Sequence, residues 1–170
     1  MKHINLTQNE KTIIDDEDYD FISQYRWHAH NGYADRKIRN FRNEEKVQHM
    51  HREIMRRQLQ RDLMQVEEVD HINGNTFDNR RCNLRIATRL QNCANRTKQK
   101  TYKGKKTTSK YKGVSWHRVT QKWRADIRVQ TKRLWLGIFE DEIEAAQAYD
   151  QAAKKYFGEF AKLNFKEYFE

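Results

Sequence analysis

The chain contains no proline, only two cysteines and no long apolar run. Cys82 and Cys93 form no CxxC pattern and have no second pair, which argues against a disulfide framework and against a thiolate zinc site. No apolar stretch approaches the length of a membrane span, and the first residues, MKHINLTQNEK, lack the apolar core of a signal peptide. We therefore expect a cytoplasmic protein with reduced thiols and no membrane partner.

Acidic residues are missing from the middle of the chain. Between Asn79 and Ala125 there are 15 Lys and Arg and no Asp or Glu, in a chain of 170 residues with net charge +10. Such a basic block is readily neutralised by nucleic acid, because binding releases the counterions condensed on the phosphates. A solvated, disordered linker is the alternative that charge alone leaves open.

Length and composition favour two small domains, since 36% hydrophobic residues support only modest cores. Alternation and turn signals predict strands at 3–6, 11–14, 47–51, 66–72 and 84–87, a hairpin at 27–34 that turns at Asn31-Gly32, and helices at 19–25, 52–63 and from residue 89. Further on, three alternating segments are expected at 111–116, 123–129 and 133–139. A helix follows them, with Asp141 as its N-cap and Gly158 past its end.

Polar residues gather in an ordered set after residue 69. They occur in Val69-Asp70-His71-Ile72-Asn73-Gly74-Asn75, in Asp78-Asn79-Arg80-Arg81-Cys82-Asn83-Leu84-Arg85, in Ala87-Thr88 and in Gln91-Asn92. No hydrophobic core requires such a run. It resembles the HNH nuclease family with its ββα-metal fold, in the branch of phage intron-encoded homing endonucleases where Asn replaces the last His.

This resemblance implies a role for each matching residue. Asp70 and Asn92 would bind one Mg²⁺ or Mn²⁺, which suits hard oxygen ligands, and Asn95 is the rival of Asn92. His71 would be the general base that deprotonates water, because a neutral imidazole with a pKa of about 6.5 accepts a proton at physiological pH. Asn83 would fix the loop, and His51 would contact phosphate or cap a helix.

A second pattern fills the C-terminal part of the chain. It comprises Ser109-Lys110-Tyr111-Lys112-Gly113-Val114, then Lys122 to Arg128, Arg133 to Phe139, Glu144-Ala145-Ala146, Ala148-Tyr149-Asp150, Gly158 and Leu163-Asn164-Phe165. Residues 109–165 resemble the APETALA-type, or ethylene-response-factor, DNA-binding domain. The resemblance implies a three-stranded antiparallel sheet with one packed helix that reads double-stranded DNA.

Strand alternation should send one set of side chains to the DNA and the other to the helix. The candidate DNA-binding residues are Lys112, Ser115, His117, Lys122, Arg124, Arg128, Arg133 and Trp135. Ser115 and His117 stand where the plant pattern tends to have arginine, so the base preference of that family is not transferred.

The sequence therefore predicts an α+β protein with an HNH nuclease domain at 1–100, a basic linker at 101–108 and an APETALA-like domain at 109–170. The predicted function is a monomeric, metal-dependent, site-directed DNA endonuclease of the homing type, without a small-molecule substrate. Two alternatives stay open: a DNA-binding regulator whose nuclease half is inactive, and a restriction endonuclease.

Overall fold

A computed structural model describes residues 1–102 and 104–165. Residue 103 of the predicted linker and residues 166–170 of the predicted C-terminal domain lie outside the described residues. Backbone contacts divide the chain into two compact units, Met1–Arg89 and Leu90–Glu170, here named the N-terminal unit and the C-terminal unit. The predicted domain boundaries stay a prediction, and this division assigns the segment from residue 90 onward to the C-terminal unit.

The N-terminal unit is built from short antiparallel hairpins and two helices. Its elements are β1 (Lys2–Asn5), β2 (Lys11–Ile14), α1 (Asp16–Ile22), β3 (His28–His30), β4 (Tyr33–Arg39), β5 (Glu45–His49), α2 (Met50–Leu59), β6 (Glu68–His71), the short helix η1 (Arg81–Asn83) and β7 (Leu84–Ala87). β1 pairs with β2, β3 with β4, β4 with β5, and β6 with β7. The predicted turn at Asn31-Gly32 is confirmed, with both residues at the positive φ that this tight hairpin turn requires.

One apolar core holds the N-terminal unit together. Ile14, Ile22, Met50 and Ile54 are fully buried in it, and Trp27 is nearly so. The Trp27 indole donates a hydrogen bond to Ile22 O at 2.9 Å, so its polar atom is satisfied inside the core.

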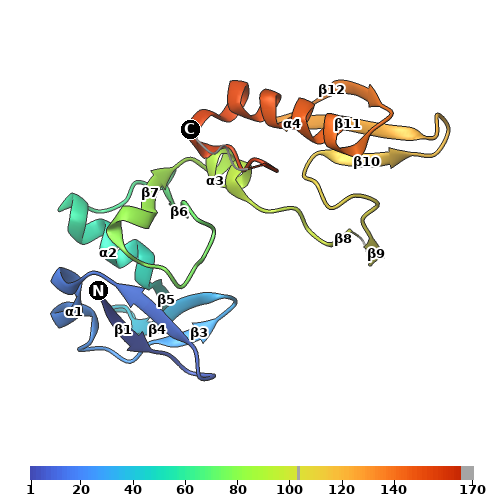
Figure 1. Cartoon of the computed structure of the whole chain (residues 1–170). Coiled ribbons are helices and arrows are strands. Elements are labelled where there is room, and N and C mark those ends of the chain that lie inside the picture. The colour runs from blue at the N-terminus through green and yellow to red at the C-terminus, as the bar shows by residue number, and fades with distance from the viewer. Residues whose placement is uncertain (103, 166–170) are drawn as a thin grey trace. The chain divides into compact units, whose positions relative to one another are not determined.

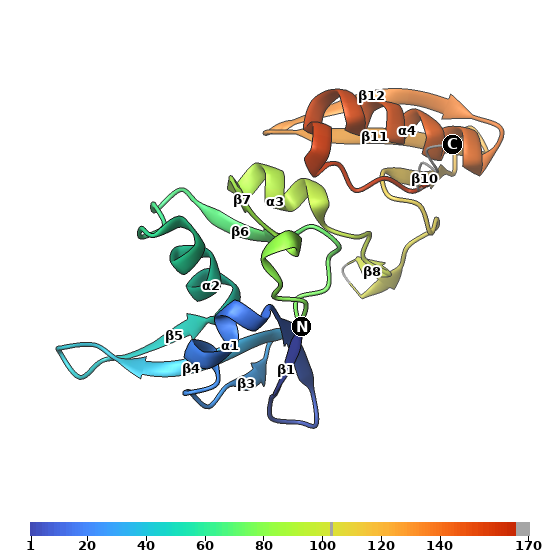
Figure 2. The ribbon, with the colours of Figure 1, turned by 60° about the vertical axis from the view of Figure 1, so that its left-hand side comes forward.

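The C-terminal unit contains a three-stranded sheet with one long helix on it (Figure 1). Its elements are α3 (Arg89–Asn95), β8 (Thr101–Tyr102), β9 (Lys105–Lys106), β10 (Val114–His117), β11 (Lys122–Val129), β12 (Lys132–Phe139), α4 (Glu142–Phe157) and the short helix η2 (Gly158–Phe160). The strand order is β10-β11-β12. Figure 2 shows α4 running along one face of this sheet. The predicted cap is confirmed, because Asp141 Oδ1 accepts hydrogen bonds from Ile143 N and Glu144 N.

Small residues allow α4 to approach the sheet closely. Ala145, Ala146 and Ala153 are fully buried, and they face Val114, Ala125 and Ile127 of the sheet. Gly113 lies under the ring of Tyr149, so near that a Cβ at Gly113 would stand 1.9 Å from Tyr149 Cδ2.

The predicted fold class is confirmed in its mixed α/β character and its antiparallel sheets, but the ββα-metal domain is not supported. β6 and β7 pair as expected. The helix that the prediction placed on them, α3, falls beyond the division at Arg89 and groups with the C-terminal unit. Among the described helices, none is both long and apolar enough to cross a membrane.

Candidate DNA-binding surface

The sheet of the C-terminal unit turns one face to α4 and the other to solvent. On β11, Ala125 and Ile127 are buried under α4, whereas the side chains that alternate with them point outward. Across the strands, Arg124 pairs with Ser115 and Ile138, and Arg128 pairs with Arg133. Trp135 is 64% exposed on β12, although a large aromatic side chain is normally more buried. The outer face therefore presents cations and an exposed indole together.

A carboxylate that the sequence analysis did not select lies in the middle of this face. Asp126 accepts two hydrogen bonds from Arg133, at 2.5 Å from Nε and 2.8 Å from Nη2, and its Oδ2 lies 3.1 Å from Arg124 Nη2. A bulge shifts the register after Ala125, so Asp126 stands opposite Trp135. Because side chains alternate along a strand, residue 126 is expected on the same face as Arg124 and Arg128. This alternation could have predicted the position of Asp126 from the sequence.

The other predicted DNA contacts on this face differ in how far their side chains are exposed and already bound to neighbouring side chains. Arg128 is exposed, whereas Arg124 is partly covered and its Nε has no hydrogen-bond partner among the described residues. Lys122 Nζ lies 2.5 Å from Glu140 Oε1, and His117 Nδ1 lies 2.8 Å from Thr120 Oγ1. Among the predicted Lys and Arg contacts on this face, Arg128 is thus the one least engaged with other side chains of the described sheet.

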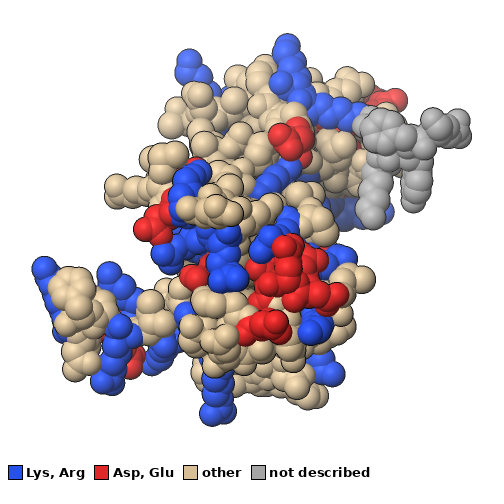
Figure 3. Space-filling view, turned by 90° about the vertical axis from the view of Figure 1, so that its left-hand side faces the viewer, with Lys and Arg blue, Asp and Glu red and all other residues tan. Residues whose placement is uncertain are grey.

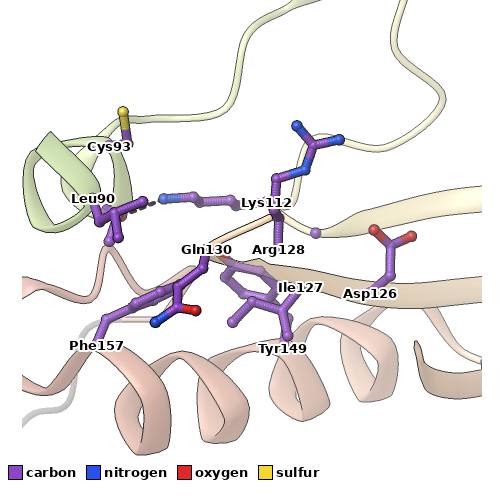
Figure 4. Close-up of a pocket in the computed structure, with 11 residues that line it drawn as sticks. Leu90, Cys93, Lys112, Asp126, Ile127, Arg128, Gln130, Tyr149 and Phe157 are labelled. Carbon is purple, nitrogen blue, oxygen red and sulfur yellow. Dashed lines mark hydrogen bonds between the residues drawn. The ribbon is translucent and has the colours of Figure 1, made fainter. Parts of the chain in front are cut away.

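Lys112, predicted to contact phosphate, is directed elsewhere. Its Nζ donates hydrogen bonds to Ala94 O at 2.5 Å and to Arg96 O at 2.7 Å, at the carboxyl end of α3 (Figure 4). The same view shows Arg128 pointing out of a cavity of about 420 Å³ whose floor includes Ile127 and Tyr149. Burial lowers the pKa of the Lys112 ammonium group to about 8. Lys112 therefore holds α3 against the sheet.

In the N-terminal unit, Asp70 and His71 are both buried and both engaged. Asp70 Oδ2 accepts a hydrogen bond from Arg85 Nε at 2.9 Å and lies 2.8 Å from Arg85 Nη2. His71 Nε2 lies 3.0 Å from Asn79 Oδ1. Because Asn79 Nδ2 donates to Thr12 Oγ1 at 2.7 Å, the Asn79 oxygen is the acceptor and His71 Nε2 carries the proton. This role of Asn79 was not predicted from the sequence.

His51 lies in a group of rings next to His71. The two ring centroids are 5.0 Å apart, and His49 stacks on His51 at 5.3 Å. Burial lowers the pKa of His51 well below 6.5, and the neighbouring His71 and His49 lower it further. Burial also lowers the pKa of His71, although its hydrogen bond to Asn79 acts in the opposite direction. Both imidazoles are therefore neutral at pH 7.

The predicted metal ligands do not form one site within either unit. Asp70 belongs to the N-terminal unit, and Asn92 and its rival Asn95 belong to the C-terminal unit. Oδ2 of the Asp70 carboxylate faces the Arg85 guanidinium group, so this oxygen is already paired in the structure. Binding of Mg²⁺ or Mn²⁺ stays a prediction. Asn83 accepts from Asn73 N at 3.0 Å and donates to Asp78 O at 2.7 Å, which ties the ends of the 73–83 loop together.

One acidic cluster of the described residues has metal-ligand spacing. It consists of Asp15, Glu17 and Asp18. Arg81 reaches it through its backbone N–H to Asp15 and through its guanidinium group to Glu17 and Asp18. These contacts make the cluster an ion-pair network that joins α1 to η1.

Comparison with known proteins identifies the C-terminal part of the chain. Residues 109–159 match the model of the AP2 domain family. Dehydration-responsive element-binding protein 2D of Arabidopsis thaliana is 51% identical over 59 residues, which are 34% of this chain and 28% of that protein. Ethylene-responsive transcription factor RAP2-11 of the same plant is 45% identical over 76 residues, which are 44% of this chain and 28% of that protein. No solved structure matches.

These relatives correct the predicted activity. The chain spans 28% or less of the length of the relatives described, which include dehydration-responsive element-binding protein 2A of Arabidopsis thaliana, 49% identical over 57 residues. They are named as element-binding proteins and transcription factors, not as homing or restriction endonucleases, so the prediction of an enzyme is wrong on this comparison. The family match covers residues 109–159 and gives no support to the predicted HNH nuclease part. The C-terminal part of the chain contains an AP2 domain, at residues 109–159.

Proposed function

We propose that this protein is a sequence-specific DNA-binding regulator that reads double-stranded DNA with the outer face of the β10-β11-β12 sheet. The observation that supports the proposal is the exposure of Arg128 and Trp135 on a sheet within the AP2 domain. A twisted antiparallel sheet fits the major groove, where each base pair presents a distinct set of donors, acceptors and methyl groups.

Different side chains on this face suit different groups on the DNA bases. The Arg128 guanidinium group offers the fork that binds the O6 and N7 atoms of guanine, and Trp135 offers an apolar surface to thymine methyl groups. Asp126 has the acceptor oxygens that match the N4 amino group of cytosine, and it limits the positions that Arg124 and Arg133 adopt. Base contacts of this kind give sequence preference, whereas the basic segment before the sheet adds affinity for any sequence.

The proposal is tested by selecting binding sites from a random duplex library with the full chain. We expect a single enriched motif. Arg128→Ala should weaken binding to that motif by about 1–3 kcal/mol, as for loss of a bidentate base contact, and should relax the preference at one base pair. Lys132→Ala, at an exposed position near the strand end, is the matched control and should act equally on motif and random DNA.

Two results would argue against the proposal. Enrichment of no motif would remove sequence-specific reading. A loss of affinity for Arg128→Ala that is the same on motif and random DNA would make Arg128 a phosphate contact.

As a DNA-binding regulator, the protein would act where the DNA lies, which in a plant cell is the nucleus and not the predicted cytoplasm.

A further inference from the structure

The N-terminal unit carries a second basic surface, on the hairpin formed by β4 and β5. Residues 36–47, here named the β4–β5 arm, contain five Lys and Arg and two Glu. None of these residues is buried, so the arm extends beyond the core, whose last buried residues on β4 are Ala34 and Asp35. Figure 2 shows the hairpin projecting from its unit, and Figure 3 shows Lys and Arg side chains around the projection.

A phenylalanine stands at the tip of the arm. Phe41 is 92% exposed and belongs to no hydrophobic cluster of the described residues. The turn beneath it is ordered by Asn40, whose side-chain oxygen accepts from Arg42 N at 3.0 Å and from Glu44 N at 2.9 Å. A fixed turn thus holds a large apolar ring in solvent, where it contributes nothing to the stability of the fold.

Two arginines flank this ring. Arg42 Cζ lies 5.4 Å from the centre of the Phe41 ring, and Arg39 Nη1 donates to Asn43 Oδ1 at 3.2 Å. Neither Arg39 nor Arg42 forms an ion pair with another described residue. Glu45 pairs with Lys37 at 2.9 Å and also feels the charge of Arg39, whereas Glu44 accepts from the neutral Asn40 Nδ2 at 2.7 Å and keeps its negative charge. With five Lys and Arg against two Glu, the arm has a net charge of +3.

We propose that the β4–β5 arm is a second DNA-binding element, which enters a groove of duplex DNA and places the Phe41 ring against the bases while Arg39 and Arg42 bind the flanking phosphates. β-ribbons bind DNA in the major or the minor groove, and apolar side chains that wedge between base steps from the minor groove kink the duplex. The inference rests on the proposed function in one respect, that the partner is duplex DNA. It adds a contact from the unit that has no AP2 domain.

The direct test is a photo-crosslink in the full chain. Phe41 is replaced by p-benzoylphenylalanine, and the protein is irradiated with a labelled random-sequence duplex. The same replacement at Met64, which is 58% exposed in the same unit but outside the arm, is the control. We expect a protein–DNA crosslink from position 41 and none from position 64. A crosslink from position 41 to a second copy of the chain, or none at all, would overturn the inference.

Binding measurements separate the roles of the ring and the cations. Phe41→Ala should weaken binding to duplex DNA about threefold to tenfold and reduce DNA bending measured by fluorescence transfer between labelled ends, without changing the salt dependence. Arg39→Gln combined with Arg42→Gln should make the negative slope of log K against log salt shallower by about 1.8, since each phosphate contact contributes about −0.9. Met64→Ala should leave all three quantities unchanged.

The outcomes distinguish this inference from the proposed function. If Arg128→Ala removes the sequence preference and the arm variants bind as wild type does, the arm is not a DNA contact and the AP2 reading stands. If the arm variants bind DNA more weakly and selection enriches no motif, the β4–β5 arm is a DNA contact and the proposal of sequence-specific binding is rejected. Since the arm is outside the core, each variant should unfold at the wild-type temperature, which circular dichroism checks.

Discussion

Arg133 donates two hydrogen bonds to Asp126, so one cation on the outer face of the β10-β11-β12 sheet is held by a carboxylate on the neighbouring strand. The same carboxylate lies 3.1 Å from Arg124 Nη2. One negative charge therefore orients two guanidinium groups and reduces the positive potential of the face at its centre. If the outer face binds DNA as proposed, this arrangement favours base contacts over phosphate contacts, because the two arginines are not free to follow the DNA backbone.

Replacing Asp126 by Asn should release both arginines. We expect tighter binding to random duplex DNA by about threefold to tenfold and a salt slope steeper by about 0.9, because one more cation becomes available to phosphate. Discrimination between the selected motif and random DNA should fall. Fluorescence anisotropy titrations over a range of salt concentrations measure all three.

Glu10→Gln is the matched control for this change, since it removes the same charge at an exposed position of the N-terminal unit. If Asp126→Asn and Glu10→Gln tighten binding equally, the effect comes from net charge and the paired arginines have no special role.

Gly113→Ala should destabilise the C-terminal unit by about 3 kcal/mol, from the left-handed backbone and from overpacking against a buried ring. The φ of Gly113 is +77° and the added Cβ would overlap the Tyr149 ring. Gly104→Ala separates the two causes, because Gly104 of the same unit has nearly the same positive φ, +75°, but has no atom within 4 Å of the new Cβ. Urea unfolding should show a clearly smaller loss for Gly104→Ala, and equal losses would contradict the packing argument.

The Lys112 ammonium group predicts a pH dependence. Its pKa is about 8 in the folded chain and 10.5 in the unfolded chain, so between these values the unfolded state binds more protons. The free energy of unfolding attributable to this group therefore rises from pH 8 to pH 10.5. Lys112→Met should flatten this rise, although it lowers stability overall by removing the hydrogen bonds to Ala94 and Arg96.

Other groups titrate in the same range, so the difference between variant and wild type is the quantity to follow. Burial raises the pKa of Tyr149, which makes stability fall as pH rises through the ordinary tyrosine range. Lys132→Met, which removes an exposed ammonium group, should keep the wild-type profile. A Lys112→Met profile parallel to that of the wild type would show that Lys112 titrates normally.

His51 should make the N-terminal unit sensitive to mild acid. Its folded pKa lies well below 6.5, so its contribution is complete above pH 6.5 and is lost as pH falls from there towards the folded pKa. His51→Gln should reduce the loss of stability between pH 7 and about pH 5, whereas His3→Gln, at an exposed imidazole, should not. Thermal unfolding followed over this range decides, and equal slopes for both variants would refute the buried cluster as the cause.

Local patterns predicted the C-terminal sheet and helix well. The strands were expected from alternation around Ala125 and Ile127, and Asp141 signalled the start of α4 through its side-chain oxygen. These signals act within a few residues, so they are visible in the sequence. The turn at Asn31-Gly32 belongs to the same class.

Pairings over long separations were not predictable in the same way. Nothing near Lys112 indicates that it binds carbonyl groups at the end of α3, and nothing near Asp70 indicates its ion pair with Arg85. The polar run that resembled a nuclease site is, in the structure, largely occupied by internal hydrogen bonds such as that of His71 with Asn79. A residue pattern gives the candidates for a site but not their partners, which depend on the tertiary fold.

The contact between Lys112 and α3 bears on how the AP2 domain is isolated. The family match begins at residue 109, but the acceptors of the Lys112 ammonium group are the carbonyls of residues 94 and 96, and Lys98 donates to Tyr111 O and Val114 O. A fragment cut at the family boundary would lose these contacts. Expression from residue 90 keeps them, so we expect the longer fragment to be the more stable form of the domain.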